Sequence, residues 1–218
     1  MFRVASLVLI IKNKKNMHKV IDPKIMYFGT PVVLISTLNE DKTPNLAPMS
    51  SAWWLKKSCL LGLGKKGKTF ENLERTRECV LNLPSSEMVA AVDRLALTTG
   101  KNPLPEYKQK MNFEFVKDKF SRAGLTEISS ELVRPPRVAE CPVQLEAVVE
   151  KIHDVYSPES SLAAIEVRIL RAYFDESILN SEKRHYIDTD KWKPLIMSFC
   201  EFYGLGENLH ISKLAKVF

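Results

Sequence analysis

Apolar and polar residues alternate along two stretches in the second half of the chain. At the odd positions of residues 141–149 every residue is apolar, whereas most even positions of residues 140–150 are polar. Residues 163–169 follow the same rule. Successive side chains of a strand point to opposite faces, and antiparallel strands commonly have one buried face. The two stretches therefore predict long, half-buried antiparallel strands, joined by a turn within residues 153–161.

Shorter apolar runs in the first half predict further strands. Val32–Leu38 is apolar and rich in β-branched residues, and the polar turn Asn39–Asn45 separates it from a second run that ends at Trp53–Trp54. This arrangement is typical of a hairpin. Cys59–Leu63 and Cys79–Leu83 predict two more strands, which are ended by glycines and by a proline.

Helical signals are fewer. A short helix is predicted after the lysine-rich loop, with Thr69 as its N-cap. A longer helix is predicted between Ser85 and Gly100, because apolar residues recur at helical spacing. Residues 101–136 are expected to be rich in loops, with a short helical stretch near Lys117–Arg122. No repeat or linker divides the chain, so one antiparallel barrel with helices in its gaps is the simplest architecture.

Composition and charge add little to this picture. Hydrophobic residues make up 45% of the 218 residues and charged residues 27%, as in an ordinary folded domain. The net charge of +6 is modest, and it collects mainly in residues 12–19 and 56–68. No groove-reading motif of the usual kinds is present, so a nucleic-acid partner is not expected.

The four cysteines lie far apart in apolar surroundings, and they form no C-x-x-C pair. No histidine stands at metal-ligand spacing from them, so no metal site is expected. The pattern predicts buried free thiols in a reducing compartment, and we expect a cytoplasmic protein. The four residues are Cys59, Cys79, Cys141 and Cys200.

Residues 1–20 are interpreted as an N-terminal extension, followed by one domain over residues 21–218. The apolar run Val4–Ile11 is too short to span a bilayer, and lysines follow it where a leader would have its cleavage site. A secretory leader stays an alternative, as does translation that starts at Met17. No membrane association is expected.

The loop at residues 62–69 reads Gly-Leu-Gly-Lys-Lys-Gly-Lys-Thr. It satisfies the Walker A pattern, and its glycines also match the dinucleotide fingerprint. Both alternatives require a parallel sheet, and a dinucleotide fold needs an acidic residue where Asn82 stands. What such loops share is converging backbone amides, a helix N-terminus and a neutralising lysine. The loop therefore predicts an anion site, with a solvated lysine-rich turn as the alternative.

Four segments resemble, in order, the flavin reductase-like family, whose members bind FMN in a split barrel. No single segment is highly specific, but their order and spacing together are more so, and the likeness runs from about Tyr27 to Asp175. The resemblance implies a mainly β fold, an antiparallel split β-barrel with peripheral helices. The matching segments are Asn45–Trp53, Lys68–Leu73, Glu78–Asn82 and Glu140–Glu146.

The resemblance also implies where FMN would bind. In the family, the segment like Ala47–Trp53 lies along the flavin ring, and the segment like Lys68-Thr69-x-x-Asn72 grips the phosphate. Which lysine reaches the phosphate stays open, because Gly64–Gly67 replaces a more usual serine-containing loop. Ordinary alternatives are a plain strand surface for the two serines and a core or dimer-interface pair for Trp53 and Trp54. The implied cofactor-binding residues are Met49, Ser50, Ser51, Ala52, Trp53, Lys65, Lys66, Lys68, Thr69 and Asn72.

The expected function is reduction of flavin by NADH or NADPH, in which the protein orients the two ring systems and excludes water. By resemblance, His185 is the candidate residue near the nicotinamide, with an exposed loop histidine as the alternative. The reduced flavin would serve a partner oxygenase or redox protein, and the family implies a homodimer. Two other functions stay open, a flavoredoxin-like FMN electron carrier and a noncatalytic flavin-binding protein.

Overall fold

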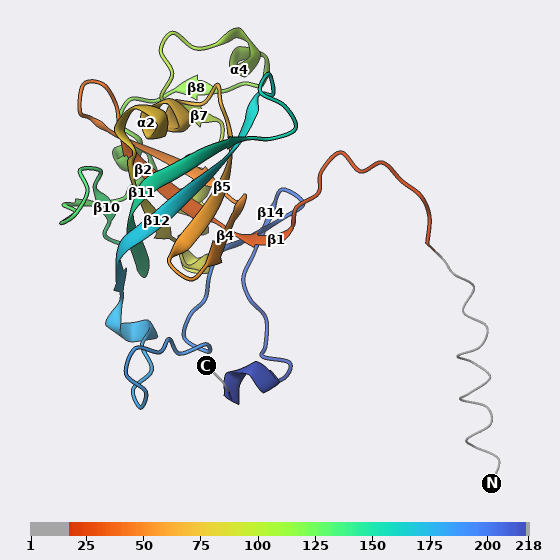
Figure 1. Cartoon of the computed structure of the whole chain (residues 1–218), viewed down its shortest axis with the longest axis vertical. Helices are drawn as coiled ribbons and strands as arrows, with labels where there is room; N and C mark the ends of the chain where they lie inside the picture. The colour runs from red at the N-terminus through yellow and green to blue at the C-terminus, as the bar shows by residue number, and fades with distance from the viewer. Residues whose placement is uncertain (1–17, 217–218) are drawn as a thin grey trace.

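The computed structural model describes residues 18–216, which are built around one seven-stranded sheet (Figure 1). The strand order is β3-β2-β6-β11-β12-β5-β4, and every neighbouring pair is antiparallel. This confirms the expected fold class and excludes the parallel sheet of a P-loop or dinucleotide fold. The strands are β2 (Val33–Leu38), β3 (Pro44–Met49), β4 (Ala52–Leu55), β5 (Ser58–Gly64), β6 (Glu78–Leu83), β11 (Val143–Asp154) and β12 (Leu162–Phe174).

The two edge strands of this sheet, β3 and β4, are neighbours in the chain. Only Ser50 and Ser51 separate them, so the sheet must curl until its edges meet at that end. Because β4 pairs with β5 over Ser58–Leu61 and the Gly62 amide adds one bond to the Ser51 carbonyl, the last residues of β5, Leu63 and Gly64, have no strand on that side. The barrel is therefore split alongside the end of β5.

Two apolar clusters bury opposite faces of β2. Val33 and Ile35 point into the barrel, whereas Leu34 packs on the outer cluster with Leu46 and Phe120. Burial on both faces explains why this strand reads as a continuous apolar run. The helix α2 (Lys68–Thr76) contributes Phe70 and Leu73 to the barrel cluster.

The two long predicted strands are confirmed as β11 and β12, an antiparallel pair joined by residues 155–161. The alternating pattern predicted that Glu146 lies on a solvent-exposed face of β11. This prediction was wrong, because the side chain of Glu146 is 0% exposed. The segment that contains β9 (Glu127–Ile128) and β10 (Arg137–Val138) lies next to β11 here. Glu146 accepts hydrogen bonds from the amides of Glu131 and Leu132, at 2.9 and 2.7 Å, and from the Tyr173 hydroxyl at 3.0 Å.

The helix predicted with Thr69 as N-cap begins earlier than expected. Gly67 is the N-cap of α2, and no side chain caps the amides of its first turn. The Thr69 hydroxyl instead accepts a hydrogen bond from the Asn45 side chain, at 3.2 Å, inside the fold. Because no side chain caps them, the first-turn amides of α2 are free to bind an anion.

The prediction of one longer helix between Ser85 and Gly100 was wrong in its length. Residues of its apolar face do pack on the outer cluster, but the chain forms only η1 (Ser86–Met88) and α3 (Val89–Asp93). It then turns at Leu97, whose φ is 53°. The apolar spacing continued beyond the helix because the turn also packs on the outer cluster. The short helix near residue 120 is confirmed as α5 (Lys119–Ala123).

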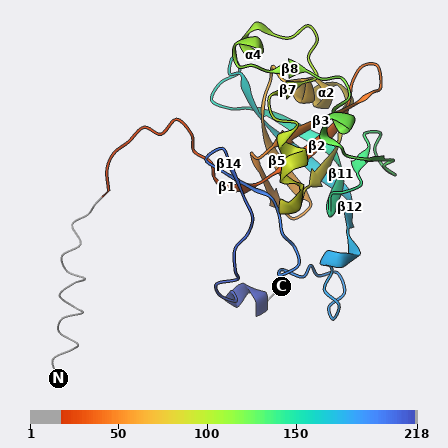
Figure 2. The same ribbon diagram turned by 180° about the vertical axis from the view of Figure 1, so that it is seen from behind.

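Between these helices the chain makes an excursion that returns to the barrel. Its elements are β7 (Thr98–Thr99), α4 (Glu106–Lys110) and β8 (Glu114–Phe115), and β7 and β8 pair in parallel. Both views place this excursion beside α2 at one end of the barrel (Figures 1 and 2).

Both ends of the described chain leave the barrel as arms. A small sheet of β1 (Phe28–Pro31), β13 (Ile196–Ser198) and β14 (Glu201–Tyr203) anchors them, and η2 (Glu176–Ile178) precedes it. Residues 18–27 and the segment that ends in η3 (Lys213–Lys216) lead away from it (Figures 1 and 2). Within residues 18–216, no helix has the length and apolar character to cross a membrane.

Three of the four cysteines are buried as predicted, and burial raises the pKa of the Cys59 thiol to about 12. The prediction was wrong for Cys200, which is exposed next to β14. The apolar run Val4–Ile11 and the alternative start Met17 lie outside the described residues.

Candidate functional site

Two cavities lie end to end along the split in the barrel. The larger, of about 460 Å³, lies between the loop that precedes α2 and the excursion at residues 98–119. The smaller, of about 320 Å³, lies beside the Ser50–Ser51 connection. Consecutive or nearly consecutive residues of three segments line first one cavity and then the other. These pairs are Ala47 and Pro48 on β3, Leu63 and Gly62 on β5, and Thr98 and Ala96 before the excursion.

The smaller cavity contains part of the segment predicted to contact a flavin ring. Met49, Ser50 and Ser51 line it. The hydroxyl of Tyr27, from the N-terminal arm, forms a hydrogen bond of 2.8 Å with the Ser51 hydroxyl. The amide of Gly62 donates to the Ser51 carbonyl at 2.7 Å. The serines are therefore held between an arm and a strand.

The other two predicted ring-binding residues, Ala52 and Trp53, do not line the cavity. Ala52 is buried in the barrel cluster, and Trp53 is 54% exposed on the outside of β4. Trp54 packs against the barrel cluster, and its indole nitrogen is buried without a hydrogen-bond partner. The core interpretation of Trp54 agrees with this placement.

The larger cavity receives the loop predicted to bind an anion. Lys66, Lys68 and Thr69 line it, together with Gly67 at the start of α2. Lys65 does not, because its ammonium pairs with Asp154 at 2.5 Å. Lys66 and Lys68 are therefore the loop lysines that could contact an anion in this cavity.

Asn72 lies outside both cavities and is fully buried. Its amide nitrogen donates to Thr37 and Asn39, at 3.1 and 3.0 Å, and its oxygen accepts from Arg75 at 3.1 Å. These bonds fix α2 on β2 and so position the first turn of the helix.

The opposite wall of the larger cavity carries two lysines that sequence reasoning missed, Lys108 on α4 and Lys119 on α5. Lys108 donates to the Thr99 hydroxyl at 2.6 Å, and burial lowers the pKa of its ammonium. Burial, together with the charge of Lys108, lowers the pKa of Lys119 to about 8. The run Lys117-Asp118-Lys119 resembles an ordinary charged surface segment, so no sequence signal marked Lys119.

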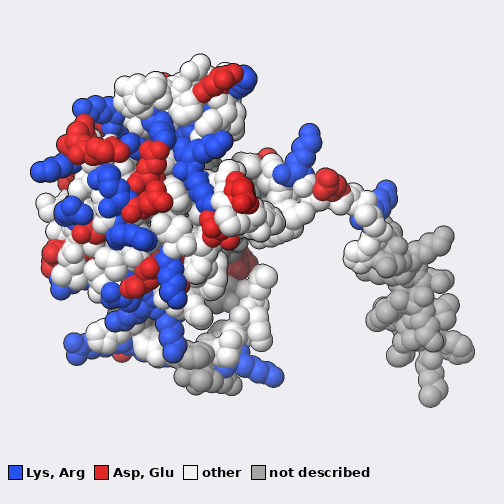
Figure 3. Space-filling model, turned by 45° about the horizontal axis from the view of Figure 1, so that its top comes forward, with Lys and Arg blue, Asp and Glu red and all other residues white. Residues whose placement is uncertain are grey.

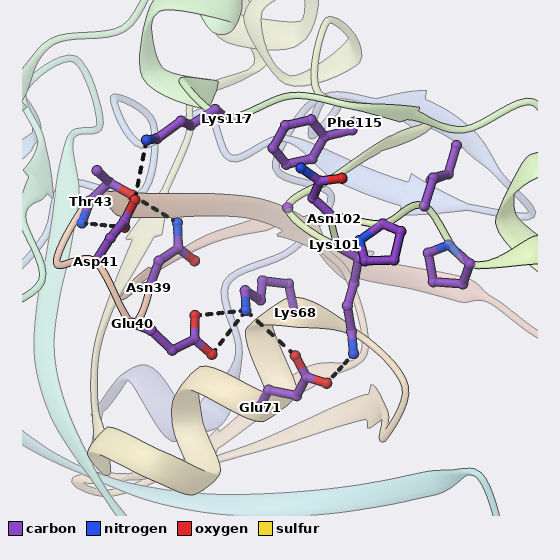
Figure 4. Close-up of a pocket in the computed structure, with 14 residues that line it drawn as sticks. Asn39, Glu40, Asp41, Thr43, Lys68, Glu71, Lys101, Asn102, Phe115 and Lys117 are labelled. Atoms are coloured by element: carbon purple, nitrogen blue, oxygen red, sulfur yellow. Dashed lines mark hydrogen bonds and ion pairs between the residues drawn. The ribbon is translucent and has the colours of Figure 1, made fainter.

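A third cavity, of about 760 Å³, lies outside the split and shares Lys68 and Gly100 with the larger of the two split cavities (Figure 4). Its lysines are compensated, and Lys68 holds the pKa of Glu40 below its usual value by hydrogen bonding to it. On the face drawn in Figure 3, basic and acidic side chains are likewise interspersed. The three pairs are Lys68 with Glu40 at 2.8 Å, Lys101 with Glu71, and Lys117 with Asp41 at 3.2 Å.

His185 lies on a different cavity, of about 500 Å³, which it shares with Lys183, Arg184 and Tyr186. The histidine has a φ of 67° and is exposed. Its cavity has no lining residue in common with the two cavities along the split. Within one chain, the structure does not bring His185 together with the predicted ring segment.

Residues 25–189 match the model of the flavin reductase like domain, and the chain belongs to this family. The uncharacterized protein YdfE of Bacillus subtilis (strain 168) is 42% identical over 198 residues, which are 91% of this chain and 94% of that protein.

Solved structures show the same fold. Flavoredoxin of Desulfovibrio vulgaris (Miyazaki F) matches with a TM-score of 0.74 at 23% identity, over 92% of this chain and 100% of that one. Component B of nitrilotriacetate monooxygenase from Bacillus cereus matches with a TM-score of 0.70 at 20% identity, over 90% and 100% of the chains. A protein of Shewanella frigidimarina NCIMB 400, described as a flavin reductase with a split barrel domain, matches with a TM-score of 0.66 at 15% identity, over 84% and 86%.

Proposed function

We propose that the chain binds FMN along the split, with the flavin ring at the smaller cavity and the phosphate in the larger one. One observation carries this proposal: the two cavities are lined by adjoining residues of the same segments, and among the described residues every charged side chain that lines the larger one is a lysine. The first-turn amides of α2 and the Thr69 hydroxyl would donate to phosphate oxygens, with Lys66 and Lys68 beside them. Lys65 and Asn72 would act indirectly, by fixing the loop and the helix.

We further propose that NADH or NADPH reduces this flavin and that the reduced flavin serves an oxygenase or another redox protein. Bound flavin supplies the hydride chemistry. Ser50 and Ser51 would orient the ring through their hydroxyls and backbone, and the apolar Met49 would help to exclude water. The shared fold with a monooxygenase component supports an oxygenase partner.

A flavoredoxin-like electron carrier is the second candidate. Tyr27 from the N-terminal arm, with Met197 and Phe202 from the small sheet, lines the smaller cavity. These side chains would restrict the room beside a bound flavin ring. Electron transfer through them would then be favoured over direct stacking of a nicotinamide on the ring. The fold shared with flavoredoxin agrees with this alternative.

Flavin binding and turnover separate the candidates. We expect the purified protein to bind FMN, with absorbance near about 450 nm. Two or three charge-assisted bonds to the phosphate would give FMN an affinity at least about 100-fold higher than that of riboflavin. Equal affinities would contradict the phosphate site. Oxidation of NADH or NADPH with FMN present identifies the reductase, whereas a bound flavin that neither nucleotide reduces identifies the carrier.

We also propose that residues 21–218 form one domain, preceded by an extension, and that the chain is a homodimer. Both arms expose large apolar side chains, which in a monomer would face water. A second copy that covers them could bring His185 beside the first copy's flavin. The most exposed are Val20, Ile21, Leu209 and Ile211.

A further inference from the structure

The wall of the larger cavity that faces α2 is built by the excursion at residues 98–119, which lies far from the predicted phosphate loop in the sequence. Lys108 and Lys119 line this wall. Of the four lysines around the cavity, Lys68 is bonded to Glu40 and Lys66 is exposed to solvent. The charge that the cavity itself holds therefore comes mainly from the wall opposite α2.

Lys119 is the most unusual residue of this wall. Its side chain is almost completely buried, at 3% exposure. None of the described residues forms a hydrogen bond or an ion pair with its ammonium. Burying a charged group without a partner is costly, and proteins generally pair buried lysines. The Lys119 ammonium, which has no partner in the described chain and lies at the edge of the cavity, is therefore available to an anion from outside the chain.

Neighbouring lysines show that this segment does provide partners elsewhere. Lys110, on α4, pairs with Glu106 at 2.7 Å, and Lys117 pairs with Asp41 at 3.2 Å. Lys119 follows Lys117 by two residues but lines the other cavity, where no Asp or Glu of residues 18–216 is present. Lys119 therefore lacks a carboxylate partner because it faces this cavity, whereas other lysines of the same segment have one.

We propose that Lys119 binds the terminal phosphate of the flavin, with Lys108 beside it, so that the phosphate lies between this pair and the first turn of α2. The proposal rests on the proposed FMN function. The ammonium of Lys119 would donate to a phosphate oxygen that the α2 amides leave free. The excursion would then be part of the binding site and would cover the phosphate.

The test compares two flavins that differ only in the phosphate. Dissociation constants for FMN and riboflavin are measured at pH 7 for the wild type, Lys119→Met and Lys108→Met. Lys110→Met is the matched control, because this lysine lies on the same segment but is 74% exposed in its side chain. We expect Lys119→Met to weaken FMN binding about 10- to 100-fold and Lys108→Met less, with riboflavin unchanged. Lys110→Met should leave both affinities unchanged.

Two further measurements separate a binding role from a structural one. Without flavin, Lys119→Met should melt at the same or a higher temperature than the wild type, because it removes a buried unpaired charge. Inorganic phosphate should compete with FMN for the wild type more strongly than for this variant. An unchanged FMN-to-riboflavin preference in a folded Lys119→Met protein would overturn the assignment of Lys119. Absence of that preference in the wild type would instead overturn the proposed phosphate site.

Discussion

The backbone amide of Gly62 donates a 2.7 Å hydrogen bond to the carbonyl oxygen of Ser51, which extends the β4–β5 pairing by one residue to the edge of the split. A Cβ atom on Gly62 would lie 2.9 Å from the Cβ of Ser51, which is closer than such atoms come in proteins. The glycine is therefore required for the close approach of β5 to the β3–β4 connection. This contact fixes the serines that line the smaller cavity.

Replacement of Gly62 by alanine should displace Ser51 and weaken flavin binding. Because the displacement affects the ring and not the phosphate, we expect the affinities for FMN and riboflavin to fall together, by about tenfold, as small misplacements at binding sites do. Fluorescence titration with both flavins measures the change. Gly206→Ala is the control, since nothing lies within 4 Å of the added methyl group. A variant that lost only FMN affinity would place the ring elsewhere.

The affinity for FMN should fall as the pH rises above 8. The pKa of Lys119 is about 8 in the free protein, and a bound phosphate would raise it. Below pH 8 the lysine is charged in both states and its contribution is complete, whereas at higher pH binding must first take up a proton. We expect about tenfold weaker binding at pH 9 than at pH 7.

Riboflavin affinity should stay constant over this range, and Lys119→Met should abolish the dependence. The other titratable groups that line the larger cavity are Lys66, Lys68, Lys108 and Tyr107. A variant that kept the wild-type pH profile would assign the dependence to one of these groups and remove Lys119 from the explanation.

The sequence predicted one half of the proposed phosphate site and missed the other. Gly67 and Thr69 were predictable because a glycine-rich loop before a helix has a known physical use. Lys119 was not, since its neighbours give it no periodicity, and its burial arises only when the excursion folds onto the barrel. The same tertiary packing misled the helix prediction, because Leu95 meets the outer cluster from a turn and not from a helix.

Glu146 should be important for stability although its strand pattern predicted an exposed side chain. Alanine at this position removes the acceptor of two backbone amides and of the Tyr173 hydroxyl. Leaving these three partly buried donors without their charged acceptor should lower the free energy of unfolding by about 2–4 kcal/mol. Urea denaturation measures the loss. Glu150→Ala is the control, because this residue forms an exposed pair with Arg168 and should cost less than about 1 kcal/mol.

The proposed role of His185 requires a second copy of the chain. If the arms pair two chains, light scattering should report about twice the mass of the 24.9 kDa chain. His185→Ala should then slow reduction of bound flavin by NADH or NADPH about tenfold or more, as removal of a positioning or proton-transfer group does, without changing the FMN dissociation constant. A dimer whose turnover is unaffected by this substitution would exclude the histidine from the reaction.

The connection at Ser50–Ser51 makes the two ends of the split unequal. At this end two residues of continuous backbone tie β3 to β4, so the gap there has a width set by covalent geometry. At the other end, the gap between α2 and α5 is bridged by side chains and an excursion anchored by a two-residue strand pair. If FMN binds as proposed, it would therefore enter and leave at the end near α2, while the serine connection beside its ring would keep its shape.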